Sequence, residues 1–582
     1  MNGLAIAAFL CPLLLAAALV VRPARPAVSM LAPCAPLPAF ALAFAPIGTL
    51  VDTPWALLDA RLGVMDAIAR GYLASTALVW FFAGWYARAY VEASKYRDSF
   101  WFFFLLTMSA NLGVIVARDA ATFYVFFSLM TYAAYGLVVH DRDAPAARAA
   151  RTYVVMALGG EMLLLTGIFV LVGSSVNLPL EEVPGAVAAS PRRLLVSCLL
   201  LAGFGVKAGL VPLHLWLPLA HPVAPTPASA VLSATIIEAG LLGWLRFLPL
   251  GAVPDAAAAT TLVCIAGLLT AFYGAAVGVV QSEPKIVLAY SSVSQMGFAV
   301  AALGVALTPA ASGAAKLAIV FFVVHHAVAK AALFLGEGVA RDAGTGRAGR
   351  LVLAGLALPA LAIAGAPFTS GALAKIGLAD VVEDAPVASR ALVALLSVAA
   401  IGSTLLMTRF LVLAARGRSQ TPRSPRKGLW IPWLLLLVAG VSLVALPALD
   451  RPVGLAVAAR ASKVASATWP IAVGVAIAFA ARRIFDRIGR TEPRIPPGDL
   501  LAIVEPLVIR LSRCAAVGYH LAHLARRRLS VRTRRLLRPR QRARRALATL
   551  DHIEDRLIGF GTIGVLTLLL AGILVPLVVR RW

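Results

Sequence analysis

Charged side chains are scarce in this chain. Only 14% of its 582 residues are Asp, Glu, Lys or Arg, whereas 60% are hydrophobic, and the mean hydropathy is +0.87. An average soluble domain carries about 25% charged residues. The scarcity of charge therefore excludes a soluble globule and predicts an integral membrane protein.

Cysteine is sparse as well, and sequence motifs for binding cofactors are absent. The five cysteines are scattered, which excludes a disulfide framework and metal-ligand spacing: Cys11, Cys34, Cys198, Cys264 and Cys514. The sequence contains no haem motif and no P-loop. We therefore expect no cofactor, no metal and no catalytic chemistry of the chain's own, so that any enzyme activity would belong to a larger complex.

Acidic residues are few, and the net charge is +26. A nucleic-acid-binding protein is one interpretation of such an excess, but the basic residues fall in short loops and in one C-terminal stretch, 526–545. This placement indicates positive-inside topology and contact with anionic lipid, and we expect no nucleic-acid binding. The segment 496–556 is predicted to be an amphipathic, basic helix in the membrane interface, against anionic headgroups or an acidic partner.

Long apolar runs recur along the chain and predict about sixteen membrane spans. The first lacks a basic leader and a cleavage site, so we expect it to be a retained helix rather than a signal peptide. The predicted cores are 3–21, 28–50, 71–91, 99–117, 119–139, 152–173, 193–212, 227–248, 257–280, 286–307, 314–336, 351–369, 390–413, 429–447, 467–481 and 557–579. Loops after odd-numbered spans are richer in Lys and Arg, which predicts an N-terminus on the non-cytoplasmic side.

Four lysines lie in or at the edge of these apolar runs: Lys207, Lys285, Lys330 and Lys375. Charge is costly in a bilayer, and ionisable residues there usually mark an ion or proton path. For Lys285, which follows Glu283 and Pro284, a side chain that reaches the interface from a helix end is an open alternative. The lysines indicate a conduit for protons or cations.

The densest polar segment adds two histidines and a series of prolines to the first lysine: Lys207, Pro212, His214, Pro218, His221, Pro225 and Pro227. Lys207 and His214 are seven residues apart, which predicts one shared helix face. Pro212 and Pro218 remove backbone donors and are expected to break the helix. A broken helix at membrane depth is tolerated only where it is buried in protein or lines a hydrated cavity.

Three further polar clusters surround the other lysines. The first places hydroxyls and an amide after Lys285: Tyr290, Ser291, Ser292, Ser294 and Gln295. Such groups relay protons or pack helices together. The second is His325, His326 and Lys330, in which imidazole is suited to carry protons near neutral pH. The third combines Pro367 with Lys375, so that a second helix breaks before a lysine, as in inverted-repeat transporters.

These segments resemble one family in sequence. VKAGLVPLHLWLPLAHPVAPTPASA, KIVLAYSSVSQMG, HHAVAKAALFL and GAPFTSGALAK match, in order, motifs of the antiporter-like, proton-translocating subunits of respiratory complex I, membrane-bound hydrogenases, formate hydrogenlyase and Mrp-type cation/proton antiporters. The resemblance covers roughly residues 60–415. It implies that Lys207 is the lysine of a first broken helix, Lys330 the central lysine and Lys375 the residue of a second broken helix.

The resemblance also implies a fold and a domain organisation. We expect an all-α polytopic membrane protein of about fourteen core helices in two inverted repeats with broken helices, followed by a basic amphipathic helix and about two further spans. The expected segments are 1–98 with N-terminal spans, 99–248 and 249–415 as the repeats, broken near Pro212 and Pro367, 416–495 with C-terminal spans, 496–556 at the interface, and 557–582 as a final anchor.

The sequence departs from the family at two places. Where members usually carry a glutamate on the fifth helix, this chain has Ser128, and where many carry a lysine on the eighth, it has Glu238. Glu161 is the other acid in an apolar run. A carboxylate near Lys207 would modulate its proton affinity. We therefore predict that Glu238, or failing that Glu161, has taken over the role of the missing acid.

The resemblance implies a proton-conducting, cation/proton-antiporting subunit of a redox-driven or Mrp-like complex in a bacterial cytoplasmic membrane. Its partners would be other membrane subunits of a complex I-like, hydrogenase-like or Mrp-like assembly, and any oxidoreductase activity would be that of the assembly. Two alternatives remain open. One is an energising partner in the uptake of dissolved inorganic carbon, and the other is a decoupled membrane scaffold.

Overall fold

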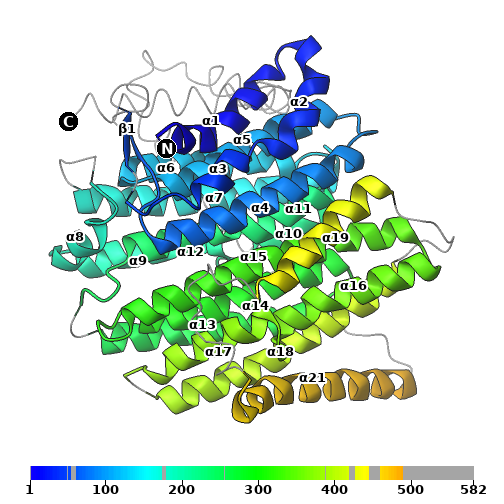
Figure 1. Ribbon diagram of the computed structural model, residues 1–582. Helices are drawn as coiled ribbons and strands as arrows, with labels where there is room; N and C mark the ends of the chain where they lie inside the picture. Colours follow the sequence, from blue (N-terminus) through cyan, green and yellow to red (C-terminus); the bar gives the residue numbers. More distant parts are fainter. Residues whose placement is uncertain are drawn as a thin grey trace, which may run out of the picture. The chain divides into compact units, whose positions relative to one another are not determined.

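The described part of the chain is a bundle of helices with one small hairpin (Figure 1). The computed structural model describes residues 2–48, 50–53, 60–172, 178–253, 256–386, 388–417, 426–444 and 459–488, all within one compact unit, Met1–Pro497. Eleven helical segments there are long and apolar enough to cross a membrane. The predicted all-α, polytopic membrane protein is confirmed, while the segment 496–556 and the span 557–579 lie outside the described residues.

The N-terminal part corrects one predicted span. Helix α1 (Asn2–Ala18) matches the first span, but 28–50 is not a single helix. It contains short helices, because prolines interrupt the backbone hydrogen bonds. These are α2 (Arg25–Leu31), which begins before residue 28, η2 (Ala32–Cys34) and α3 (Leu37–Leu42). The short helix η1 (Arg22–Ala24) precedes them. Strands β1 (Val51–Thr53) and β2 (Ala60–Leu62) then form an antiparallel pair.

The remaining predicted spans that fall on described residues form helices with bounds within several residues of the predicted ones. These are α4 (Ala67–Tyr90), α5 (Arg97–Val116), α6 (Ala120–Val138), α7 (Ala144–Val172), α9 (Arg193–Ala208), α13 (Ala257–Val279), α14 (Pro284–Val305), α15 (Ser312–Ala343), α16 (Arg347–Ala364), α18 (Ser389–Arg416), α19 (Lys427–Ser442) and α21 (Ala461–Ile488). The predicted span 227–248 is built from α11 (Thr226–Val231), the π-helical turn η3 (Leu232–Ile236) and α12 (Ile237–Phe247).

Three helices are not among the predicted spans. Helices α8 (Val183–Ala189) and α10 (Trp216–Val223) are too short to cross a membrane alone, and α17 (Ser370–Glu383) follows the second helix break. The orientation was predicted from the Lys and Arg content of the loops after odd- and even-numbered spans. Because α17 is an additional helix and 28–50 is not one span, the numbering of the spans changes. The side on which the N-terminus lies therefore stays a prediction.

Two helix breaks lie in the bundle. Helix α9 ends at Ala208 and is followed by Gly209 with φ 73°, and α16 ends at Ala364 and is followed by Gly365 with φ 90°. Only glycine adopts this left-handed conformation without strain, so each glycine ends its helix. The first break, 209–215, contains Pro212, and the second, 365–369, contains Pro367.

The other two prolines predicted to break helices occupy different positions. Pro218 lies in the first turn of α10, where a missing backbone donor costs little, and Pro225 precedes α11 as its N-cap residue. The helix break at the first lysine is therefore produced at Gly209, before Pro212, and Pro218 does not break a helix.

Helices α13 and α14 pack with their backbones in contact. A Cβ atom at Gly267 would lie 2.5 Å from the amide nitrogen of Ala301, and one at Gly297 would lie 2.4 Å from that of Ala271. Such distances leave no room for a side chain, and small residues commonly permit close helix packing in membranes. The glycines thus hold α14, which carries several polar residues, tightly against α13.

An ion pair joins the start of α4 to the end of α12. Asp66 is the N-cap residue of α4, and its carboxylate accepts a hydrogen bond from the amide of Ala69 at 2.9 Å. Arg246 donates two hydrogen bonds to the same carboxylate, at 2.6 and 2.8 Å. Burial opposes the charged form of Asp66, but the bonds and charge of Arg246 outweigh it and hold the pKa of Asp66 below its usual value.

We expect Asp66→Ala to lower the thermal stability of the purified chain more than Asp66→Asn does. Asparagine still caps the helix, whereas alanine loses the cap as well as the charge, and the cap alone contributes about 1 kcal/mol. The pair should stabilise the chain at neutral pH, and this contribution should be lost as the pH falls through the lowered pKa of Asp66. Asp52→Ala, which removes an exposed partner of Arg61, is the control and should change little. Equal melting temperatures for the two Asp66 variants would contradict the capping role.

Candidate functional site: a series of buried lysines

Lys207 lies in a small cavity at the end of α9 and is 4% exposed. Its ammonium donates a hydrogen bond to the Tyr153 hydroxyl at 3.3 Å and lies 5.9 Å from the centre of the Trp216 ring. Aromatic faces attract a cation at such distances. Glu161 lines the same cavity and interacts electrostatically with Lys207. The cavity thus contains a lysine, a carboxylate and aromatic rings.

The acid at Lys207 is Glu161 and not Glu238. Glu161 accepts a hydrogen bond from Ser128 at 2.5 Å, so the serine that stands where the family carries an acid contacts the carboxylate that lines the cavity. Glu238 does not line the cavity, and its Oε1 atom pairs with Nδ1 of His326 at 2.9 Å. The order of preference in the prediction, Glu238 before Glu161, is therefore wrong. The reason is that α12 directs Glu238 towards α15.

The two histidines of the first segment are buried on separate elements. His214 lies in the break after α9, and its ring centre is 5.2 Å from that of Tyr273 and 6.1 Å from that of Tyr290. The prediction that Lys207 and His214 share a helix face is wrong, because the helix ends at Ala208. His221 lies in α10 and stacks on Phe334 at 4.8 Å.

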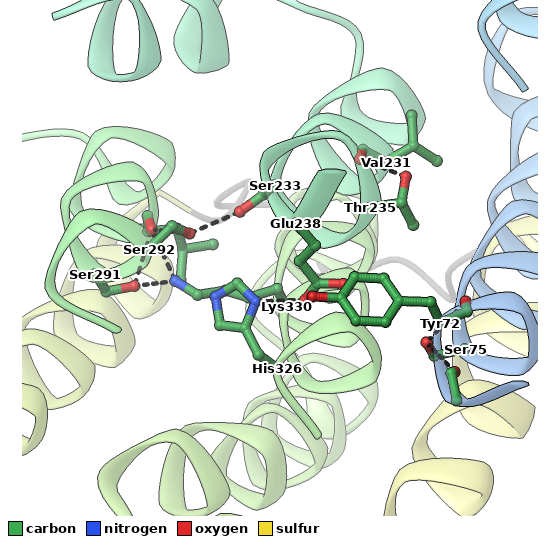
Figure 2. Close-up of polar contacts among 12 residues, drawn as sticks. Tyr72, Ser75, Val231, Ser233, Thr235, Glu238, Ser291, Ser292, His326 and Lys330 are labelled. Carbon is green, nitrogen blue, oxygen red and sulfur yellow. Dashed lines mark hydrogen bonds and ion pairs between the residues drawn. The ribbon is translucent and has the colours of Figure 1, made fainter. Parts of the chain in front are cut away.

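Lys330 is fully buried at the centre of α15. It donates hydrogen bonds to the carbonyl oxygen of Leu288, at 2.8 Å, and to the Ser291 hydroxyl, both on α14 (Figure 2). Next to Ser291, the hydroxyl of Ser292 is hydrogen-bonded to that of Ser233 at 2.7 Å. The predicted cluster after Lys285 thus supplies the oxygen partner of the central lysine.

His326 lies one helical turn before Lys330 and contacts Glu238 on α12 (Figure 2). Both side chains are at most 1% exposed. A buried carboxylate is stable only when it is paired or protonated, and the imidazole provides the partner. The structure therefore brings together Glu238, His326 and Lys330, which the sequence places on two different spans.

Lys285 is buried and donates a hydrogen bond to the carbonyl oxygen of Ala224 at 2.7 Å, between α10 and α11. The alternative of a lysine that reaches the interface is therefore wrong. The Lys285 ammonium also interacts electrostatically with Glu337, a buried acid near the end of α15. Ser294, three positions beyond Ser291 on α14, is buried as well.

Lys375 lies after the second break. It donates hydrogen bonds to the carbonyl oxygen of Ala364, at 3.2 Å, and to the Ser403 hydroxyl, at 3.1 Å. Gln295 donates to the same hydroxyl at 3.0 Å. His325, on α15, is hydrogen-bonded at 2.9 Å to Ser370, the first residue of α17. His325, the neighbour of His326, thus contacts α17, the helix that carries Lys375.

The sequence does not single out several residues of these sites, among them Tyr153, Ser403 and Glu337. Glu337 could have been found, because it is an acid seven residues after Lys330 in an apolar helix. The hydroxyls of Tyr153 and Ser403 give no such signal, since tyrosine and serine also pack between helices.

Several known proteins are similar to this chain in sequence or in fold. Residues 117–378 match the family described as NADH:quinone oxidoreductase/Mrp antiporter, transmembrane. Proteins named as antiporter subunit mnhA2 are 29% identical over 436 residues in Staphylococcus saprophyticus, covering 68% of this chain and 54% of the relative, and 27% identical over 433 residues in Staphylococcus epidermidis, with the same coverage. The chain spans about half the length of these curated relatives.

Two solved structures show a similar fold. One is a chain of the Mrp complex from a Dietzia species, with TM-score 0.66 and 24% identity, covering 94% of this chain and 62% of that one. The other is a chain of an archaeal membrane-bound sulfane sulfur reductase, described as a respiratory membrane complex, with TM-score 0.65 and 20% identity, covering 81% and 99%.

The apolar helices, the two helix breaks and the charged side chains inside the bundle define a multi-pass membrane protein with a polar interior. Within this class, residues 117–378 match the family described as NADH:quinone oxidoreductase/Mrp antiporter, transmembrane, in agreement with the resemblance of the sequence motifs.

Proposed function

We infer that the chain is a proton-conducting membrane subunit of an Mrp-like cation/proton antiporter assembly. The observation that carries this proposal is that four lysines, three of them buried and Lys375 partly buried, each have an oxygen partner. Lys207 bonds to a tyrosine hydroxyl, Lys285 to a carbonyl oxygen, and Lys330 and Lys375 to both a serine hydroxyl and a carbonyl oxygen. A charged side chain is costly inside a membrane, and ionisable residues at successive positions there usually mark an ion or proton path.

The proposed path runs along these sites. A proton on the Glu161–Lys207 pair would pass by His214 and the hydroxyls of α14 to Lys330, and His325 with Ser370 would connect the central site to Lys375. The two breaks support this role, because backbone freed from a helix is tolerated where it lines a polar interior. Glu238 and His326 would hold a second proton beside Lys330, and Lys285 and His221 would belong to the same polar interior.

An Mrp-like assembly is favoured over a redox-driven one because the curated relatives are named as antiporter subunits. The partners would be other membrane subunits of that assembly. We further propose that the chain lies in the cytoplasmic membrane of a bacterium, with its N-terminus on the non-cytoplasmic side. Residues 526–545 would bind anionic lipid.

Two measurements test the function. Purification of the tagged full chain in mild detergent should recover antiporter-type membrane subunits, and everted vesicles that contain the assembly should lose a pH gradient when Na⁺ or K⁺ is added. Recovery of quinone-reductase or hydrogenase subunits would favour the redox-driven assembly. Recovery of a carbon-uptake protein, with no cation-dependent proton flux, would overturn the antiporter proposal.

A further inference from the structure

We propose that Tyr72 is a positioning residue for the central site, formed by Glu238, His326 and Lys330. Its hydroxyl holds the second carboxyl oxygen of Glu238. Tyr72 lies on α4, before the stretch 117–378 that matches the antiporter family. The proposal concerns a contact of the central site, and it rests on the proposed function only for its consequence in transport.

Geometry brings the two side chains together. Helix α4 packs against α15 and against η3, the turn that leads into α12, so it lies beside both helices of the Glu238–His326 pair. Figure 2 shows the phenol ring of Tyr72 extending from α4 towards the carboxylate of Glu238. The charge of Glu238 also acts on the Tyr72 hydroxyl.

Both polar groups are buried and lack another partner. Tyr72 and Glu238 are each 1% exposed, and among the described residues neither the Tyr72 hydroxyl nor Glu238 Oε2 has a hydrogen-bond partner. A phenol is a donor, and a carboxyl oxygen is an acceptor. Because a buried polar group left without a partner is destabilising, a donor and an acceptor that face each other in this way are expected to bond.

Competing partners are already occupied. The other charged group that acts on Tyr72 is Arg246, whose guanidinium makes two bonds to Asp66. The other oxygen of Glu238 is paired with His326. The hydroxyl of Tyr72 thus fixes the plane of the carboxyl group and presents Oε1 to His326, one turn from Lys330.

Infrared spectroscopy of the full chain in lipid tests the contact without any transport. Loss of a hydrogen bond should shift the carboxyl band of Glu238, identified by its disappearance in Glu238→Met, to higher frequency in Tyr72→Phe. Ser75→Ala is the matched control, because Ser75 lies one turn away on the same buried face and bonds only to carbonyl oxygens of its own helix. An unshifted band in Tyr72→Phe would overturn the proposal.

A double-mutant cycle keeps the test decisive where a variant is poorly stable. If the two groups are bonded, the fall in melting temperature for Tyr72→Phe combined with Glu238→Met should be smaller than the sum of the single falls. Additive falls would overturn the contact.

Measurement of proton flux tests whether the contact between Tyr72 and Glu238 matters for transport. Cation-driven proton flux should fall about three- to tenfold in Tyr72→Phe, as expected for one hydrogen bond to a carboxyl group, and should remain unchanged in Ser75→Ala. A shifted infrared band with unchanged flux would confirm the contact and refute its role in transport. Absence of flux in the wild-type assembly would instead refute the proposed function and leave the contact established.

Discussion

Replacing Lys330 by alanine should abolish coupled ion transport while leaving the amount of the chain in the membrane unchanged. Lys330 is fully buried, and its ammonium bonds to Leu288 and Ser291 on α14. Alanine cannot bind a proton there, so a path through the central site would be interrupted. Removal of a buried charge also removes its desolvation cost, so we expect no loss of insertion.

The measurement is cation-dependent proton flux in everted vesicles, with the amount of protein determined by immunoblot. Lys316→Ala offers a matched control, because Lys316 lies on the same helix and is not fully buried. Flux should be at background in the Lys330 variant and near normal in the control. Near-normal flux in Lys330→Ala would refute a path through this lysine.

Glu161→Gln should lower the same flux by at least about tenfold. Even at about 8 Å, two unit charges interact by on the order of 2 kcal/mol at an effective dielectric constant near 20, and a change of about 1.4 kcal/mol in a barrier is already a factor of ten. Glutamine retains the shape of the side chain but removes the charge that acts on Lys207. Glu182→Gln, which changes an exposed acid in the loop after α7, should have no effect.

The contact between Ser128 and Glu161 allows a rescue experiment. Because Ser128 Oγ lies 2.5 Å from the Glu161 carboxylate, a glutamate at position 128 would place its charge in the same region. We expect Ser128→Glu to restore much of the flux in the Glu161→Gln background. Normal flux in Glu161→Gln alone would show that the Lys207 site acts without a carboxylate. A loss of flux that Ser128→Glu does not restore would show that a carboxylate at position 128 does not replace Glu161.

The sites that the sequence identified are those where charge interrupts an apolar run. Lys207, Lys330 and Lys375 could be recognised because an ionisable group in or beside an apolar run is costly in a membrane and usually has a function. Their hydrogen-bond partners depend on which helices pack together, and a single sequence does not contain that information. Glu238 is the clearest example, because its assignment to Lys207 rested on chain order and the structure pairs it with His326.

The fold was predictable to a similar degree. Long, predominantly apolar runs gave helices such as α14 and α15, since a window of hydropathy detects length and composition. Residues 28–50 have the same apolar composition but contain prolines, which end helices within the run. Helix α17 was missed because its final turn contains acids, Asp380 and Glu383, which a hydropathy window assigns to a loop.

The glycine contacts between α13 and α14 determine where the molecule can change shape. With backbones touching at Gly267 and Gly297, neither helix can rotate or slide without a collision, so the pair is one rigid element. Ser291 and Gln295, which contact Lys330 and Ser403, are fixed to this element. Any conformational change must therefore occur outside α13 and α14, and the hydroxyl and amide groups of α14 form a stationary row.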